Sequence, residues 1–136
     1  MIIGTGVDIV EIGRIKKAAD KWKGKFLNRV FTDKELCYAN SKKFSYQHLA
    51  ARFAAKEAVL KAFGDSSIND MEWKNIEIVN NHDGKPIVKL TGQAKKTMLK
   101  KGISDIIVSL SHTRNYAVAN AILIRNSCPT TSFRRV

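Results

Sequence analysis

Two carboxylates in different parts of the chain are the residues most able to do chemistry. Asp8 stands in the segment GVDIV, within an otherwise apolar stretch that predicts a strand, and Glu57 stands in the alanine-rich segment ARFAAKEAVLKAFG. A carboxylate in an apolar strand is unfavourable unless a cation or hydrogen-bond donors compensate for its lost hydration. Together the two acids would form an incomplete oxygen cage of the kind that Mg²⁺ completes with water and phosphate oxygens, and Mn²⁺ suits the same ligands. A second interpretation, in which Asp8 caps the helix that starts near Glu11, fits its position equally well.

The alanine-rich segment predicts a helix over residues 45–63, because alanine is the best helix former and Gly64 stands where a C-terminal cap is expected. The charged residues of this helix fall opposite a stripe of alanines: Arg52, Lys56, Glu57 and Lys61. In one interpretation they form a solvated face with a Glu57–Lys61 pair worth about 0.2–0.5 kcal/mol. In the other, Lys61, one turn beyond Glu57, binds phosphate as a point charge.

A group of hydrogen-bonding side chains ends the apolar stretch before residue 114. Ser111, His112 and Thr113 follow one another and precede Arg114, so a phosphate could be held there. The alternative is a structural histidine, which is the commoner role. Adjacent Ser and His residues do not predict a catalytic triad, because neighbouring strand residues point to opposite faces.

The glycines of GTG at residues 4–6 do not complete a dinucleotide-binding fingerprint. Ile9 stands where the third glycine is required, and no strand–helix–strand unit follows.

Hydrophobic periodicity and turn residues predict a single α+β domain over residues 1–125, with a tail at 126–136. The N-terminal strand and helices precede antiparallel hairpins, and the helix at 45–63 packs on the sheet. Thr32 and Glu35 have the spacing of a capping box, and Asp83–Gly84 is a hairpin signal. The predicted strands cover 1–10, 73–80, 85–90, 103–113 and 116–125, and the predicted helices cover 12–22, 25–31, 32–40, 45–63 and 91–101.

The chain is strongly basic, with a net charge of +12, and half of that excess lies in residues 14–34. Such a field attracts nucleic acid, an anionic membrane, phosphorylated small molecules or an acidic protein. A nucleic-acid module gives no account of Asp8 and Glu57, which would repel a polyanion, and the basic helix lacks the wide apolar face of a membrane-surface helix. The chain shows no signal peptide and no membrane-spanning run, and Cys37 and Cys128 have neither metal nor redox spacing, so we expect a cytoplasmic protein.

Four segments, in this order, resemble the 4′-phosphopantetheinyl transferases of the short, single-unit type: GVDIVEIGRI, RFAAKEAVLKAFG, DGKPIV and VSLSHTRNYAVANAIL. The resemblance implies transfer of the phosphopantetheine arm of coenzyme A to a serine of apo acyl carrier protein, in fatty acid biosynthesis. It implies that Asp8 and Glu57 bind Mg²⁺ and that Lys61 stabilises the leaving phosphate, with Glu57 or a water on the metal as the base. It also implies a group of residues that contact coenzyme A: Arg52, Gly64, Lys85, Pro86, Ser111, His112 and Thr113.

The same resemblance implies two protein partners. Acyl carrier proteins are strongly acidic, so the basic residues of 14–29 become a docking face: Arg14, Lys17, Lys21, Lys25 and Arg29. Members of this size resemble homotrimers in which one subunit supplies Asp8, Glu57 and Lys61 and a neighbour completes the coenzyme pocket.

Overall fold

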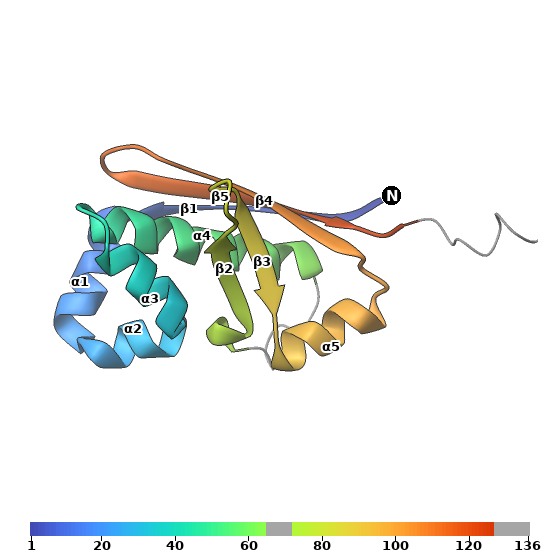
Figure 1. The fold of residues 1–136 in the computed structure, drawn as a ribbon, viewed down its shortest axis with the longest axis horizontal. Coiled ribbons are helices and arrows are strands. Elements are labelled where there is room, and N and C mark those ends of the chain that lie inside the picture. The colour runs from blue at the N-terminus through green and yellow to red at the C-terminus, as the bar shows by residue number, and fades with distance from the viewer. Residues whose placement is uncertain (65–71, 127–136) are drawn as a thin grey trace, which may run out of the picture.

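A three-stranded antiparallel sheet packed on one long helix forms the centre of the fold (Figure 1). The computed structural model describes residues 1–64 and 72–126, so the loop predicted at 65–70 and most of the predicted tail lie outside the described residues. No helix of the described ranges is long and apolar enough to cross a membrane. The α+β class is confirmed by the order of the elements: β1 (Ile2–Glu11), α1 (Ile12–Trp22), α2 (Gly24–Val30), α3 (Asp33–Asn40), α4 (Ser45–Phe63), η2 (Trp73–Asn75), β2 (Ile76–Asn80), β3 (Pro86–Leu90), α5 (Gly92–Lys100), β4 (Asp105–His112) and β5 (Tyr116–Ile124).

The main sheet has the strand order β1–β5–β4, and β2 and β3 form a separate hairpin. In Figure 1 the main sheet runs along the top, with α4 beneath it and α1–α3 below one end of α4. Asp8 of β1 pairs with Ala119 of β5, which in turn pairs with Leu110 of β4, so these three residues share one face of the sheet. That face meets α4.

The glycines of the GTG segment allow β1 to approach the backbone of α4. A Cβ added at Gly6 would lie 2.0 Å from the carbonyl oxygen of Ala58, and one at Gly4 would lie 2.4 Å from that of Ala62. No side chain fits into these gaps, so only glycine permits this approach. The two glycines that do not fit a dinucleotide fingerprint therefore serve helix–sheet packing.

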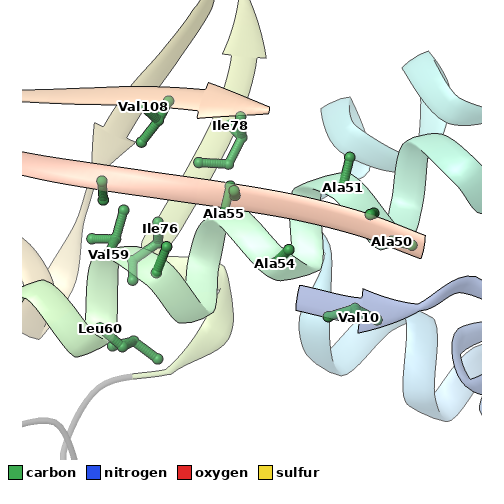
Figure 2. Packing of buried hydrophobic residues seen from close by; sticks show 14 of the residues in the cluster. Val10, Ala50, Ala51, Ala54, Ala55, Val59, Leu60, Ile76, Ile78 and Val108 are labelled. Carbon is green, nitrogen blue, oxygen red and sulfur yellow. The ribbon is translucent and has the colours of Figure 1, made fainter. Parts of the chain in front are cut away.

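Small side chains on α4 form the centre of the hydrophobic core (Figure 2). Ala54, Ala55 and Ala58 are fully buried, and Val59 and Leu60 continue the buried surface. Larger side chains from the surrounding strands fill the space beside the alanines, among them Val10, Ile76, Ile78 and Val108. Apolar burial of this kind is the main favourable term in folding, and it fixes the orientation of α4 against the sheet.

The strand predicted for residues 73–80 is wrong at its start. Trp73–Asn75 form a 3-10 turn, and β2 begins at Ile76. The Trp73 ring stacks on Phe53 of α4 with 5.0 Å between the ring centroids, and the backbone N–H of Glu72 donates to Oδ1 of Asn75. The Trp73 ring is therefore held by α4, and the alternating pattern at residues 73–75 does not mark a strand.

The predicted caps and the hairpin turn are confirmed. The side chain of Thr32 and that of Glu35 accept each other's backbone N–H, as a capping box requires. Gly64 ends α4 in the left-handed conformation with φ of 73°. Gly84 has φ of 85° in the turn that joins β2 and β3.

Candidate active site

Asp8 and Glu57 line the same cavity. It has a volume of about 380 Å³ and is bordered by β1, α1, α2 and α4, with Arg14, Phe26 and Phe53 among its lining residues; we call it the carboxylate cavity. Nζ of Lys61 donates to Oδ1 of Asp8 at 2.9 Å and to the backbone carbonyl oxygen of Val7. The structure therefore brings together the three residues whose chemistry the sequence singled out.

The meeting of Asp8 and Glu57 follows from the way in which β1 packs on α4. Asp8 lies on the same face of β1 as Gly6 and Val10, since side chains alternate along a strand. Gly6 brings the backbone of β1 against that of α4. Glu57 and Lys61 lie one turn apart on α4, so both are neighbours on the helix surface. The cap interpretation of Asp8 is wrong, because the N-cap residue of α1 is Glu11, whereas Asp8 lies within β1 and its carboxylate accepts a hydrogen bond from Lys61.

The electrostatics of this group are those of two acids close to one another. Burial raises the pKa of Glu57, the charge of Asp8 raises it further, and Lys61 opposes the shift. The hydrogen bond to Asp8 raises the pKa of Lys61, as do the charges of both carboxylates. Two neighbouring carboxylates repel one another when both are charged, which is why one pKa is raised. A cation bound between them would offset this repulsion.

The donor set fits a hard divalent cation. Asp8 and Glu57 offer carboxylate oxygens, which are the protein ligands that Mg²⁺ takes one or two at a time. Within the two described ranges, no group of three or more His, Cys, Asp or Glu side chains is arranged to hold a metal ion. Two carboxylates leave most of an octahedral shell to water and to oxygens of a substrate. The ammonium group of Lys61 is itself a cation, and it forms an ion pair with Asp8.

Five of the seven residues expected to contact coenzyme A line a second cavity, of about 420 Å³: Arg52, Lys85, Pro86, Ser111 and His112. The cavity lies between α3, α4, the β2–β3 turn and the end of β4; we call it the cationic cavity. Sequence reasoning missed Tyr38, His48 and Asn80, which also line it. The only available signal was that His48 precedes Arg52 by one helical turn.

Arg52 is held by two other residues of the cationic cavity, Tyr38 and Asn80. Its side chain is 3% exposed, its guanidinium lies 4.2 Å from the centroid of the Tyr38 ring, and Nη2 donates to Oδ1 of Asn80. Nε is buried and has no hydrogen-bond partner among the residues that the structure describes. A buried guanidinium with an unused donor is suited to an anionic ligand.

Two of the expected coenzyme residues lie elsewhere. Thr113 is engaged in the β4–β5 turn, where its hydroxyl accepts the backbone N–H of Tyr116. Gly64 caps the C-terminal end of α4, about three helical turns beyond Arg52. The structure does not bring either residue to the cationic cavity.

The predicted solvated face of α4 is wrong for Arg52 and Lys56. Lys56 is fully buried and forms an ion pair with Glu35 of α3 at 2.7 Å. It also donates to the backbone carbonyls of Trp73 and Ile76, and Glu35 accepts the backbone N–H of Ile78. Burial lowers the pKa of Lys56, and the charge of Glu35 opposes that shift. This pair joins α3, α4 and β2, and sequence spacing contains no signal for it.

All five residues of the expected docking face are exposed: Arg14, Lys17, Lys21, Lys25 and Arg29. Three lie on α1 and two on α2. Arg14 also lines the carboxylate cavity. The basic surface therefore adjoins the two acids.

The chain is similar to known proteins along most of its length. Residues 4–121 match the 4′-phosphopantetheinyl transferase superfamily. The holo-[acyl-carrier-protein] synthase of Geotalea daltonii is 48% identical over 90% of this chain and 98% of its own. The crystal structure of the Neisseria meningitidis synthase covers 92% of this chain and 100% of its own, with a TM-score of 0.82 and 31% identity. The Bacillus anthracis synthase in complex with coenzyme A (3′,5′-ADP) covers 93% of this chain and 99% of its own, with a TM-score of 0.76 and 34% identity.

Proposed function

Because the chain belongs to the 4′-phosphopantetheinyl transferase superfamily, we propose that it transfers the 4′-phosphopantetheine group of coenzyme A to a serine of apo acyl carrier protein. Adenosine 3′,5′-bisphosphate leaves. The observation that carries the proposal is that Asp8 and Glu57, from different elements, line one cavity beside Lys61. Fatty acid biosynthesis in the cytoplasm is the proposed setting.

In this proposal Asp8 and Glu57 hold Mg²⁺. When bound, the cation neutralises charge on the pyrophosphate and orients it. Lys61 donates hydrogen bonds to the phosphate that leaves, where negative charge accumulates as the phosphorus–oxygen bond breaks. Glu57, which lines the carboxylate cavity, is the group of this chain placed to accept the serine proton while the serine oxygen bonds to phosphorus.

The cationic cavity receives the 3′-phosphate and the adenine. Arg52, His112 and Ser111 supply hydrogen-bond donors, and Lys85 and Pro86 border the base. Of the residues that the structure describes, none lines both cavities. Arg52 and Glu57 are five residues apart on α4, which places them roughly 140° apart around its axis. A single chain therefore presents the two halves of the site on different sides of α4, and we propose that neighbouring subunits of a homotrimer join them.

A bare apolar sheet face supports such an assembly. α4 covers one face of the main sheet, and Figure 1 shows no helix of the described residues on the other. Val7 and Ile9 point to that uncovered face and are 60% and 66% exposed, and Ile107 is also exposed. Exposed apolar patches on a folded domain mark interaction surfaces. Burial of this face between copies accounts for its composition.

The basic surface on α1 and α2 is the proposed docking site for the acidic carrier protein. Complementary charge raises the association rate and fixes orientation. Because Arg14 also lines the carboxylate cavity, a carrier bound here presents its serine beside Glu57.

The proposal is tested by incubating the protein with coenzyme A, Mg²⁺ and an apo carrier protein and weighing the carrier by mass spectrometry. We expect a gain of one phosphopantetheine. The Glu57→Gln variant is expected to keep the fold and produce no gain. A carrier whose mass is unchanged by the parent protein would contradict the proposal.

A further inference from the structure

The cationic cavity contains a histidine, His48, that has no part in the function described so far. His48 lies on α4 one turn before Arg52 and lines the cavity together with His112. Its ring meets the Tyr38 ring edge-on, with 5.6 Å between the centroids, and lies 6.2 Å from the His112 ring. Two of the chain's three histidines therefore share one cavity.

The charged groups around His48 are all basic. They come from each element that packs here: Lys42 after α3, Arg52 on α4 and Lys85 in the β2–β3 turn. The other titratable groups are Tyr38 and His112. No Asp or Glu of residues 1–64 or 72–126 lines the cavity. The ring nitrogens of His48 have no hydrogen-bond partner in these two ranges, so they are available to a ligand.

Protonation of His48 is unfavourable in the ligand-free cavity. Burial lowers its pKa, and the charges of Arg52, His112 and Lys42 lower it further. A phosphate dianion in the same cavity would reverse this balance, because an opposite charge within about 4–6 Å favours the protonated imidazole.

We propose that His48 takes up a proton when the 3′-phosphate of coenzyme A enters the cationic cavity, so that coenzyme binding is coupled to protonation of this residue. The inference rests on the proposed function, and it adds a specificity residue to that function. By linkage, the affinity for coenzyme A falls as pH rises between the pKa of free and of ligand-bound His48, by up to about tenfold per pH unit.

The direct test is calorimetric titration with adenosine 3′,5′-bisphosphate at pH 7.5, in buffers of different ionisation enthalpy, which counts protons taken up on binding. A phosphate monoester has its second pKa near about 6, so the ligand is mainly dianionic there. We expect proton uptake by the parent protein and a clear loss of uptake in His48→Gln. Adenosine 5′-phosphate, which lacks the 3′-phosphate, should cause little uptake in either protein.

The chain offers a matched control in His82, which is exposed, lies outside the cavity and pairs with Asp83. His82→Gln should take up as many protons as the parent. Between pH 7 and 8.5 the parent should lose affinity by about threefold to tenfold, and His48→Gln by less than about twofold. Equal uptake by His48→Gln and the parent would overturn the inference and leave the proposed function intact. No binding of the bisphosphate by the parent would overturn both.

A second measurement uses the parent protein and requires only that the NMR signals of the histidine rings be assigned. The pH titration of the His48 ring protons by NMR should move to higher pH when the bisphosphate is present. An unchanged titration curve with the ligand bound would overturn the inference.

Discussion

Replacing Gly6 by alanine is expected to displace β1 from α4 and so to separate Asp8 from Glu57. The new Cβ would lie 2.0 Å from the carbonyl oxygen of Ala58 and 2.8 Å from the backbone nitrogen of Ala62, where ordinary contact begins at 3.4 Å. Both neighbours are backbone atoms, so no side-chain rotation relieves the clash. Overpacking of this kind costs about 1–3 kcal/mol, which corresponds to a decrease in Tm of roughly 3–10 °C for a chain of this size.

The effect on activity is expected to exceed the effect on stability. A misplacement of reacting groups by about 1 Å can reduce the rate 100-fold, so transfer to the carrier protein should fall by about that factor at temperatures where the variant is still folded. Circular dichroism melting gives the Tm, and mass spectrometry of the carrier gives the rate.

Gly13→Ala is the matched control. Gly13 lies in α1, and a Cβ there meets nothing within 4 Å. Alanine in a helix is more stable than glycine by about 0.5–1 kcal/mol, so this variant should melt slightly higher and transfer at the parental rate. If Gly6→Ala melts with the parent protein and keeps its activity, the argument that the glycines position the carboxylates is refuted.

Three further changes test other parts of the account. Glu57→Gln should abolish transfer. Burial and a second carboxylate raise the pKa of Glu57, so the metal-free parent should lose stability as pH rises from about 4.5 through that pKa. Thermal melts should show no such loss in the variant. Lys56→Met leaves Glu35 buried without its counter-charge, so urea unfolding should show a loss of about 3–5 kcal/mol. Combined Arg14→Glu and Lys21→Glu should raise the KM for carrier protein roughly tenfold in steady-state assays and leave that for coenzyme A unchanged.

Each of these has an outcome that would count against it. Transfer by Glu57→Gln at the parental rate would remove its role, and a Lys56→Met variant as stable as the parent would show that the buried pair is not needed. For the docking face, reversal of the exposed Lys96 and Lys100 on α5 makes the same change of charge on another helix. If that control raises the KM for carrier protein as much as the α1 reversal does, the change in KM comes from the net charge of the protein and not from docking on α1.

The local features of the fold were predictable because they depend on neighbouring residues. The capping box of Thr32 and Glu35 and the left-handed Gly64 each follow from a short-range rule, and both are present. The start of β2 was not predictable, because the Trp73 ring is held by Phe53, which is 20 positions away in the chain.

The candidate site was likewise predictable only in part, because its residues on α4 have partners that are distant in the chain. The sequence indicated that Asp8 and Glu57 were chemically unusual. It also contains Gly4 and Gly6, but nothing along the chain indicates that these glycines bring β1 against α4. Arg52 and Lys56 looked like surface charges, because their partners lie on α3 and β2 and no spacing along the chain reveals them. For His48 the sequence held only its position one helical turn before Arg52, since its role depends on a cavity made by four separate segments.

The most direct test of the central claim is a crystal structure of the protein with coenzyme A and Mg²⁺. The account predicts one cation bonded to a carboxylate oxygen of both Asp8 and Glu57, at the distance of about 2.0–2.1 Å that Mg²⁺ requires, with its remaining ligands from the pyrophosphate and water. A structure with coenzyme A in place and the cation bonded to neither acid, or with Asp8 still paired only with Lys61, would contradict it.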